Sequence, residues 1–174
     1  QVKVYDSVDA LIASDDIDIL SICSPANVHV EQIIKGAEAG KAMVIEKPVG
    51  MTWEDTRRAV EAVEKAGVKT VVSFVLRWNP LFTIIKNLLD QKAIGNVFYA
   101  ECDYWHWVGP HYAQYKWSRT KEAGGSSLLS AGCHAVDALR WFNGEIVEVQ
   151  GYSTKGFPCS DYEFEPNIVA ALKF

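Results

Sequence analysis

Short apolar runs alternate with amphipathic segments along the first half of the chain. Residues 17–23 are rich in β-branched side chains and almost wholly apolar, which predicts a strand covered on both faces and therefore a parallel sheet. The next segment has apolar residues at helical spacing and predicts a helix that Asn27 can cap and Gly40 ends. Its apolar positions are Val30, Ile33, Ile34 and Ala37.

The alternation then repeats. Residues 42–45 predict a second strand, and residues 70–74 predict a third. Between them, Thr52 and Asp55 resemble a capping box at the start of a helix that Gly67 stops. Strand, helix, strand, helix and strand with tight connections form the repeating right-handed crossover unit of a doubly wound α/β fold.

The second half of the chain has a different pattern. Residues 96–107 follow an apolar helical segment, alternate imperfectly, and predict a long strand of an open sheet. Residues 126–143 predict a helix that Gly144 ends. Two further strand-like stretches at 146–153 and 168–174 complete an α+β pattern with an open, mainly antiparallel sheet.

Composition narrows the class of protein. With 49% hydrophobic and 22% charged residues, the 174-residue chain has the makeup of a soluble globular protein. The formal net charge of −5 provides no basic field for phosphates, which argues against a nucleic-acid partner. No apolar run approaches the roughly 20 residues that span a bilayer, and no leader opens the chain, so we predict a cytoplasmic protein without membrane contact.

The cysteines give no sign of a metal or redox centre. They are widely spaced and include no C-x-x-C pair, so we interpret them as isolated buried thiols. Their positions are Cys23, Cys102, Cys133 and Cys159. Cys102, His106 and His111 are close in sequence, but their spacing matches no trusted ligand pattern, so we predict no metal site.

Polar residues follow the first two predicted strands. Ligands of open α/β sheets bind at the carboxyl ends of the strands. Ser24 and Asn27 lie there beside a helix N-terminus, which favours an anionic or polyhydroxyl ligand, although a simple helix cap explains Asn27 better when the loop is taken alone. Glu46 and Lys47 follow the next strand. They form either an exposed ion pair or, if the lysine is desolvated in a cleft, a proton-transfer site.

The late helix carries a third candidate site. Ser130, His134, Asp137 and Trp141 recur at helical spacing, so one stripe presents a hydroxyl, an imidazole and a carboxylate. Gly132 in the middle of a helix is unfavourable, which indicates the close approach of a ligand or of another backbone segment. We therefore favour a catalytic role for His134 over a structural one.

Together these motifs resemble a known family. The combination of SPANVH, EKP and AGCHAVD, in this order and over essentially the whole chain, resembles the Gfo/Idh/MocA oxidoreductases. The resemblance implies that residues 1–78 are part of a Rossmann-type domain that binds NAD or NADP. It also implies that residues 79–174 are part of an α/β domain that binds substrate and forms a homo-oligomer through its sheet. The implied activity is hydride transfer between a nicotinamide cofactor and a hydroxyl of a sugar, cyclitol or related polyol.

The resemblance also implies roles for individual residues. Lys47 would contact the reacting hydroxyl, His134 would be the acid/base, and Asp137 would orient the site or hold a substrate hydroxyl. The cofactor side would comprise Ser24, Pro25, Asn27, His29, Glu46, Lys47, Pro48 and Arg77. The substrate side would comprise Lys47, Trp117, Ser130 and Asp137. The aromatic stretch 104–117 is equally consistent with a sugar platform and with a packed sheet or subunit interface.

The chain departs from the family pattern at two places. Ser130 stands where many members have an aspartate, and a serine offers no charge to stabilise an imidazolium. The 174 residues contain no G-x-G-x-x-G turn, so we expect that loop upstream of Gln1, a chain truncated at both ends, and poor dinucleotide binding by this part alone. A nicotinamide-binding regulator and an NAD-assisted glycoside hydrolase remain alternatives on the same fold.

Overall fold

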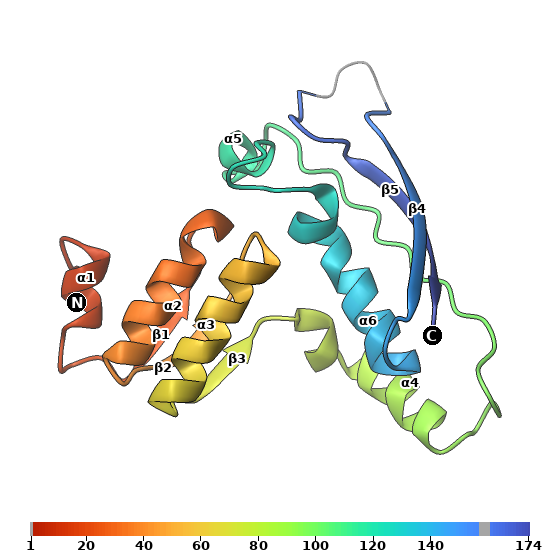
Figure 1. Cartoon of the computed structure of the whole chain (residues 1–174), viewed down its shortest axis with the longest axis horizontal. Coiled ribbons are helices and arrows are strands. Elements are labelled where there is room, and N and C mark those ends of the chain that lie inside the picture. The colour runs from red at the N-terminus through yellow and green to blue at the C-terminus, as the bar shows by residue number, and fades with distance from the viewer. Residues whose placement is uncertain (1, 157–160) are drawn as a thin grey trace. The chain divides into compact units, whose positions relative to one another are not determined.

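The computed structural model describes residues 2–156 and 161–174, so the prediction for Cys159 lies outside the described residues. The chain divides into two units, the first ending at Ser73 and the second beginning at Phe74. Figure 1 shows helices and strands in both units. The α/β fold class that the sequence predicts is confirmed, with a parallel sheet in the first unit and an antiparallel one in the second.

The first unit is built on a three-stranded parallel sheet. Its strands are β1 (Ile19–Ile22), β2 (Ala42–Ile45) and β3 (Thr70–Val72), in that spatial order. The helices are α1 (Val8–Ile12), η1 (Ala26–Val28), α2 (His29–Glu38) and α3 (Trp53–Ala66). α2 and α3 lie side by side over one face of the sheet in Figure 1, as two successive right-handed crossovers require.

One face of this sheet is buried and the other is exposed. Leu20 and Met43 are buried with Ile33 of α2, while Ile19 on the opposite face is 63% exposed. The prediction that the first strand is covered on both faces is therefore wrong for the described chain. Because β1, β2 and β3 follow one another in space as in sequence, both crossover helices lie on the same face.

The two helix caps predicted in this unit have different outcomes. The Thr52 hydroxyl accepts a hydrogen bond from the Asp55 amide at 3.0 Å and donates one to the Asp55 carboxylate at 2.9 Å, which confirms the cap of α3. Asn27 does not cap α2. It lies inside η1, where the Val28 amide donates to the Pro25 carbonyl at 3.1 Å, and this turn replaces a side-chain cap.

The second unit combines helices with a two-stranded antiparallel sheet. Its helices are η2 (Val75–Trp78), α4 (Pro80–Asp90), α5 (Tyr115–Ser118), η3 (Leu128–Gly132) and α6 (Cys133–Asn143). The strands are β4 (Glu148–Thr154) and β5 (Asn167–Lys173), with Gly151 opposite Ala170. The helix predicted at 126–143 thus exists, but its first part is a π-helical turn, η3.

The strand predicted at residues 96–107 is not present. This stretch has no regular secondary structure, and Phe98 and Trp105 are 98% and 91% exposed. A strand exists only when a neighbour accepts its backbone hydrogen bonds. Within residues 2–156 and 161–174, the only sheets are β1–β2–β3 and β4–β5, and neither pairs with this stretch.

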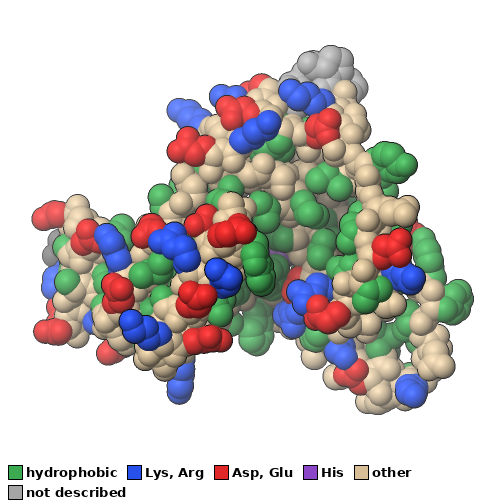
Figure 2. All heavy atoms as spheres, viewed as in Figure 1, with side chains coloured by type: hydrophobic (Ala, Val, Ile, Leu, Met, Phe, Trp, Pro, Cys, Tyr) green, Lys and Arg blue, Asp and Glu red, His purple; other side chains and the backbone are tan. Residues whose placement is uncertain are grey.

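Charged side chains are frequent on the outer surface of α2 and α3. Figure 2 shows acidic and basic side chains intermixed over α2 and α3, where Arg58 Nη2 lies 2.7 Å from Glu31 Oε1. Exposed pairs of this kind contribute little to stability because water and salt screen them. No helix in the described part of the chain is long and apolar enough to cross a membrane.

Candidate functional site

The first unit brings two predicted loops to one edge of its sheet. Ile22, Ile45 and Val72 are the last residues of their strands, and Ile45 is in register with both of the others. The Glu46 amide donates to the Ile22 carbonyl at 2.9 Å, which holds the start of the second loop beside the end of β1. The polar residues after β1 and β2 therefore share the carboxyl edge, the usual ligand-binding edge of a parallel sheet.

His29 joins these two loops. Its side chain is buried, with 1% exposed. Nδ1 lies 2.9 Å from the Pro48 carbonyl oxygen, and Nε2 lies 2.8 Å from the Ser24 carbonyl oxygen. The structure thus places Ser24, His29 and Pro48 together, although no local pattern predicts that one side chain contacts both loops.

The remaining loop residues have different surroundings. The Ser24 hydroxyl donates to Gln32 Oε1 of α2 at 2.7 Å, so the Ser24 side chain is oriented by a residue that sequence reasoning did not select. Asn27 is exposed, while Pro25, Glu46 and Lys47 are half-buried. Hydroxyl donors, backbone groups and an amine at one sheet edge are the groups that bind polyhydroxyl or phosphate-bearing ligands.

Gly50 is a second residue that the sequence did not single out. It is buried, and a Cβ atom there would lie 2.9 Å from Thr56 Oγ1 and 3.0 Å from the Thr56 backbone nitrogen. The loop that carries Lys47 therefore packs directly onto the start of α3, and only glycine leaves room for that contact.

In the second unit, one face of α6 lies against η2. Arg77 donates from Nε to Asp137 Oδ2 and from Nη2 to Asp137 Oδ1, both at 2.8 Å. The same guanidinium lies 5.3 Å from the ring centroid of Trp141, a cation–π geometry. The hydrogen bonds that Arg77 donates to the Asp137 carboxylate raise the pKa of Arg77, which stays a cation. Arg77 and Asp137, predicted as separate contacts to cofactor and substrate, therefore bind each other.

His134 lies on the same side of α6, among aromatic rings. Its ring is 5% exposed and packs edge-on to Phe74, with centroids 6.2 Å apart, and stacks on Tyr104 at 5.4 Å. Three members of the predicted stripe, His134, Asp137 and Trp141, share one face of the helix, since all three contact the segment from Phe74 to Arg77. The fourth, Ser130, lies in the preceding π-helical turn.

The helical turn that precedes His134 leaves little room for a side chain at position 132, which is a glycine. A Cβ atom there would lie 3.2 Å from Leu128 Cδ1 and 3.5 Å from the Ser127 carbonyl oxygen. The close approach that the glycine predicted is therefore made by the preceding turn of the same helix. Ser130 is half-buried inside this π turn, and such single turns are frequent at functional sites.

The aromatic stretch contains a linked series of rings. From His134 and Tyr104 it continues to His106, whose ring lies 6.0 Å from Tyr104 and 5.6 Å from Tyr112. A cavity of about 480 Å³ lies at its far end, within the size range of small-molecule sites. It is lined by Pro110, His111, Tyr112, Ala113, Tyr115, Lys116 and Arg119. Trp117 lies on α5, in the segment that borders this cavity.

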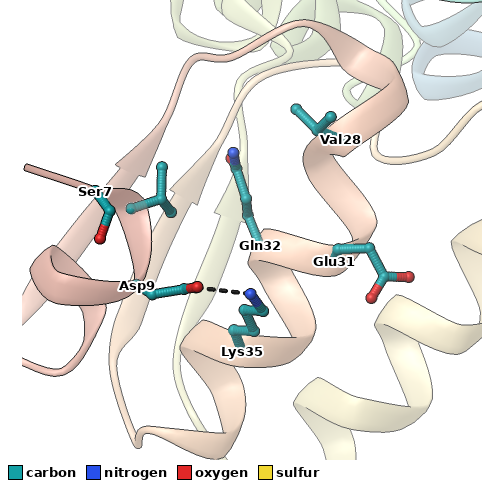
Figure 3. Close-up of a pocket in the computed structure, with 7 residues that line it drawn as sticks. Ser7, Asp9, Val28, Glu31, Gln32 and Lys35 are labelled. Atoms are coloured by element: carbon teal, nitrogen blue, oxygen red, sulfur yellow. Dashed lines mark hydrogen bonds and ion pairs between the residues drawn. The ribbon is translucent and has the colours of Figure 1, made fainter.

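Of the three cysteines that the structure describes, Cys23 is exposed and Cys102 and Cys133 are half-buried, so the prediction of fully buried thiols is wrong for these three. Burial raises the pKa of the Cys102 thiol, with a smaller effect from Asp103. Among the described residues, no group of three His, Cys, Asp or Glu side chains is placed to hold a metal ion. Figure 3 shows a pocket of about 210 Å³ between α1 and α2, closed on one side by the ion pair of Lys35 and Asp9. None of the predicted site residues lines it.

We expect the pair of Arg77 and Asp137 to stabilise the second unit measurably. Asp137 is 11% exposed, so its bidentate bond is less screened than a surface pair. In a double-mutant cycle of Arg77→Leu and Asp137→Asn, the coupling energy from urea unfolding should be about 1 kcal/mol.

The pair of Arg140 and Glu145 is the matched control. It also involves α6, but the Glu145 side chain is 79% exposed. Its coupling should stay below about 0.5 kcal/mol because solvent screens it. Equal coupling energies for the two pairs would contradict a special role for the Asp137 pair.

Comparisons with known proteins agree with this architecture. Residues 1–74 match the model of the "Oxidoreductase family, NAD-binding Rossmann fold", and residues 82–174 match that of the "GFO/IDH/MocA C-terminal domain". The chain is 31% identical to trans-1,2-dihydrobenzene-1,2-diol dehydrogenase of Xenopus laevis, over 89% of this chain and 46% of that protein. It is 25% identical to the rhizopine catabolism protein MocA of Rhizobium meliloti, over 83% of this chain and 44% of that protein.

The fold of the chain is also similar to that of a solved dehydrogenase structure. The WlbA dehydrogenase from Bordetella pertussis, crystallised with NADH and UDP-GlcNAcA, superposes with a TM-score of 0.88 at 29% identity. The match covers 97% of this chain and 49% of that one. The chain thus spans about half the length of the relatives that it matches. The two family models together cover nearly all of the sequence, and the chain belongs to the Gfo/Idh/MocA family of oxidoreductases.

Proposed function

We propose that the whole protein is an NAD(P)-dependent dehydrogenase that acts on a hydroxyl of a sugar, cyclitol or related polyol. The observation that carries the proposal is the position of the Glu46-Lys47-Pro48 loop at the carboxyl edge of a parallel sheet, in a chain whose two parts match the two domains of an oxidoreductase family. Ligands of such sheets bind at this edge.

The residues at this edge fit the nicotinamide end of a dinucleotide. The Ser24 hydroxyl oxygen and the two carbonyl oxygens of Ser24 and Pro48 each bind one protein group and can accept a second hydrogen bond, and Lys47 in the same loop as Pro48 carries an amine donor. The family description of residues 1–74 as an NAD-binding fold and the NADH found with the WlbA dehydrogenase support NAD as the first cofactor to test, with NADP as the alternative. The bound nicotinamide would supply the hydride acceptor.

In the proposed reaction, the substrate carbon loses a hydride and its hydroxyl loses a proton, so that the alcohol becomes a carbonyl. Lys47 donates a hydrogen bond to the reacting oxygen, and His134 takes the proton from it. Ser130 and Trp117 contribute to the substrate side, while Asp137 acts through Arg77. In the reverse direction, His134 returns the proton to the carbonyl oxygen.

The substrate class rests on the relatives and on the aromatic stretch. Of the relatives named above, one acts on a diol and another was crystallised with a nucleotide sugar. The ring series from Tyr104 to Tyr112 and the cavity beside it supply flat apolar faces, which pack well against the C–H faces of sugar rings. We therefore propose a ring polyol as substrate and the aromatic stretch as its platform.

The sheet of the second unit supports a homo-oligomer as part of the proposal. Val149, Tyr152 and Val169 on β4 and β5 are all more than half exposed. Exposed apolar side chains of this density on a sheet are typical of a surface that another chain or segment covers. Light scattering of the whole protein tests this part.

The decisive experiment is reduced-nicotinamide fluorescence of the whole protein with NAD or NADP and a panel of sugars, cyclitols and sugar acids. We expect a signal with at least one ring polyol. Cofactor binding without turnover would favour a nicotinamide-binding regulator. Release of a free sugar from a glycoside without net cofactor reduction would instead identify an NAD-assisted glycoside hydrolase.

A further inference from the structure

The first unit contains a buried imidazole that no step of the proposed reaction uses. His29 is the first residue of α2, and only 1% of it is exposed. Both of its ring nitrogens lie within hydrogen-bond distance of backbone carbonyl oxygens, one from each loop at the carboxyl edge. Buried polar side chains are as a rule hydrogen-bonded, and this one contacts both loops at once, in addition to the backbone bond between Glu46 and Ile22.

The two contacts are chemically alike, since a carbonyl oxygen only accepts hydrogen bonds. A neutral imidazole has one N–H and donates to one of the two carbonyls, while an imidazolium donates to both. In either state the ring fills the space between Ser24 and Pro48. An imidazolium holds both loops by a buried hydrogen bond, whereas a neutral ring holds one loop by a hydrogen bond and the other by packing. An unpaired buried group costs roughly 1–3 kcal/mol, which makes a shift of a hydrogen-bonded loop rare.

Of the two contacts, the one with Pro48 lies next in sequence to Lys47, the residue proposed to bind the reacting oxygen. Pro48 directly follows Lys47, and its carbonyl is anchored by the ring of a residue on a different element. Packing of Gly50 against Thr56 fixes the same loop two residues later. The Lys47 backbone is therefore held between a strand end and two fixed points, and its amine can be presented from a constant position.

We propose that His29 is a positioning residue that holds the Ser24 and Lys47 loops at a fixed separation for the nicotinamide end of the cofactor, an inference that rests on the proposed function. It would contact neither the cofactor nor the substrate. This replaces the expectation that His29 belongs to the cofactor-binding surface, because both ring nitrogens already face protein carbonyls.

Three substitutions separate the two contacts. The amide nitrogen of asparagine lies near the place of Nδ1, so His29→Asn keeps a donor for Pro48 and loses the one for Ser24. The amide nitrogen of glutamine lies near the place of Nε2, so His29→Gln keeps the donor for Ser24 and loses the one for Pro48. His29→Phe fills the space and provides no donor.

The test is hydrogen–deuterium exchange of the whole protein, read by mass spectrometry on peptides that cover residues 22–28 and 45–52. We expect His29→Phe to speed exchange in both peptides by about tenfold or more, as the loss of a buried hydrogen bond implies. His29→Asn should affect mainly the first peptide, and His29→Gln mainly the second. The dissociation constant for the dinucleotide should rise by about tenfold in His29→Phe, with a smaller rise in the amide variants.

Ile33→Ala is the control for a loss of packing. Ile33 is fully buried on the same helix and belongs to the hydrophobic core. Ile33→Ala should therefore destabilise the whole unit, and exchange should not speed up preferentially in the two loop peptides. The inference is overturned if His29→Phe leaves both peptides at the wild-type rate, or if Asn and Gln affect the same peptide. The inference is also overturned if His29→Phe speeds hydrogen exchange equally in all peptides of the first unit, as Ile33→Ala is expected to do. Because exchange needs no turnover, a wild-type protein that transfers no hydride would refute the proposed function and leave this test decisive.

Discussion

Lys47→Ala is expected to lower kcat of the whole protein by about 10²–10⁴-fold, the usual range for removing a group that assists proton transfer or stabilises charge on a reacting oxygen. Lys47 follows β2 at the carboxyl edge of the sheet and is half-buried. Its amine is the positively charged group in a loop held by His29 and Gly50, so its loss removes charge stabilisation without moving the loop. Dinucleotide affinity should change much less than kcat. Stopped-flow measurement of nicotinamide reduction separates the two effects.

A second lysine, next to the opposite end of β2, provides the matched control. Lys41 immediately precedes β2, and its amine donates to the Ser14 and Ile17 carbonyls at 2.9 and 2.7 Å. Lys41→Ala removes an amine from the opposite end of the strand, so it should reduce stability and leave kcat near the wild-type value. If Lys41→Ala and Lys47→Ala lower kcat equally, Lys47 has no special part in the reaction. Lys47→Arg tests geometry, since the bulkier guanidinium keeps the charge and should not restore the rate.

Local patterns predicted much of the first unit because its elements are defined by short-range signals. The apolar run of β2 and the cap of α3 by Thr52 lie where the sequence indicates, since each depends on neighbours within a few residues. The predicted coverage of β1 on both faces failed for a different reason. β1 is only four residues long, and its exposed face carries Ile19 beside a single polar residue, Ser21, so the sequence does not distinguish a half-buried strand from a fully buried one.

The rest of the site depends on contacts between distant residues. Arg77 and Asp137 were each selected from sequence, but a pairing across 60 positions has no local signature. His29 was selected only as a neighbour of the first loop, and its bond to Pro48 crosses 19 positions. Residues 96–107 alternate as a strand would, yet alternation supplies no partner, and the structure therefore leaves them irregular. The π turn at Leu128–Gly132 contains one more residue than an α-helical turn. The apolar pattern that predicted the helix gives no sign of this extra residue.

His134→Asn is expected to lower kcat by about 10²–10⁴-fold while the KM for the polyol changes little, because the amide can hold a hydrogen bond but cannot take the proton. His134 is buried beside Phe74 and Tyr104, and asparagine fills part of the space of the imidazole while it loses the ring contacts. The serine at position 130 provides no carboxylate to stabilise a protonated His134, which makes the reaction depend more strongly on the imidazole itself and on Lys47. Arg140→Ala is the control on the same helix. Arg140 is exposed and pairs with Glu145, so its removal should leave both constants unchanged. A His134→Asn protein with normal kcat and a raised KM would show that His134 only binds the substrate, and the proton would then have to leave through Lys47.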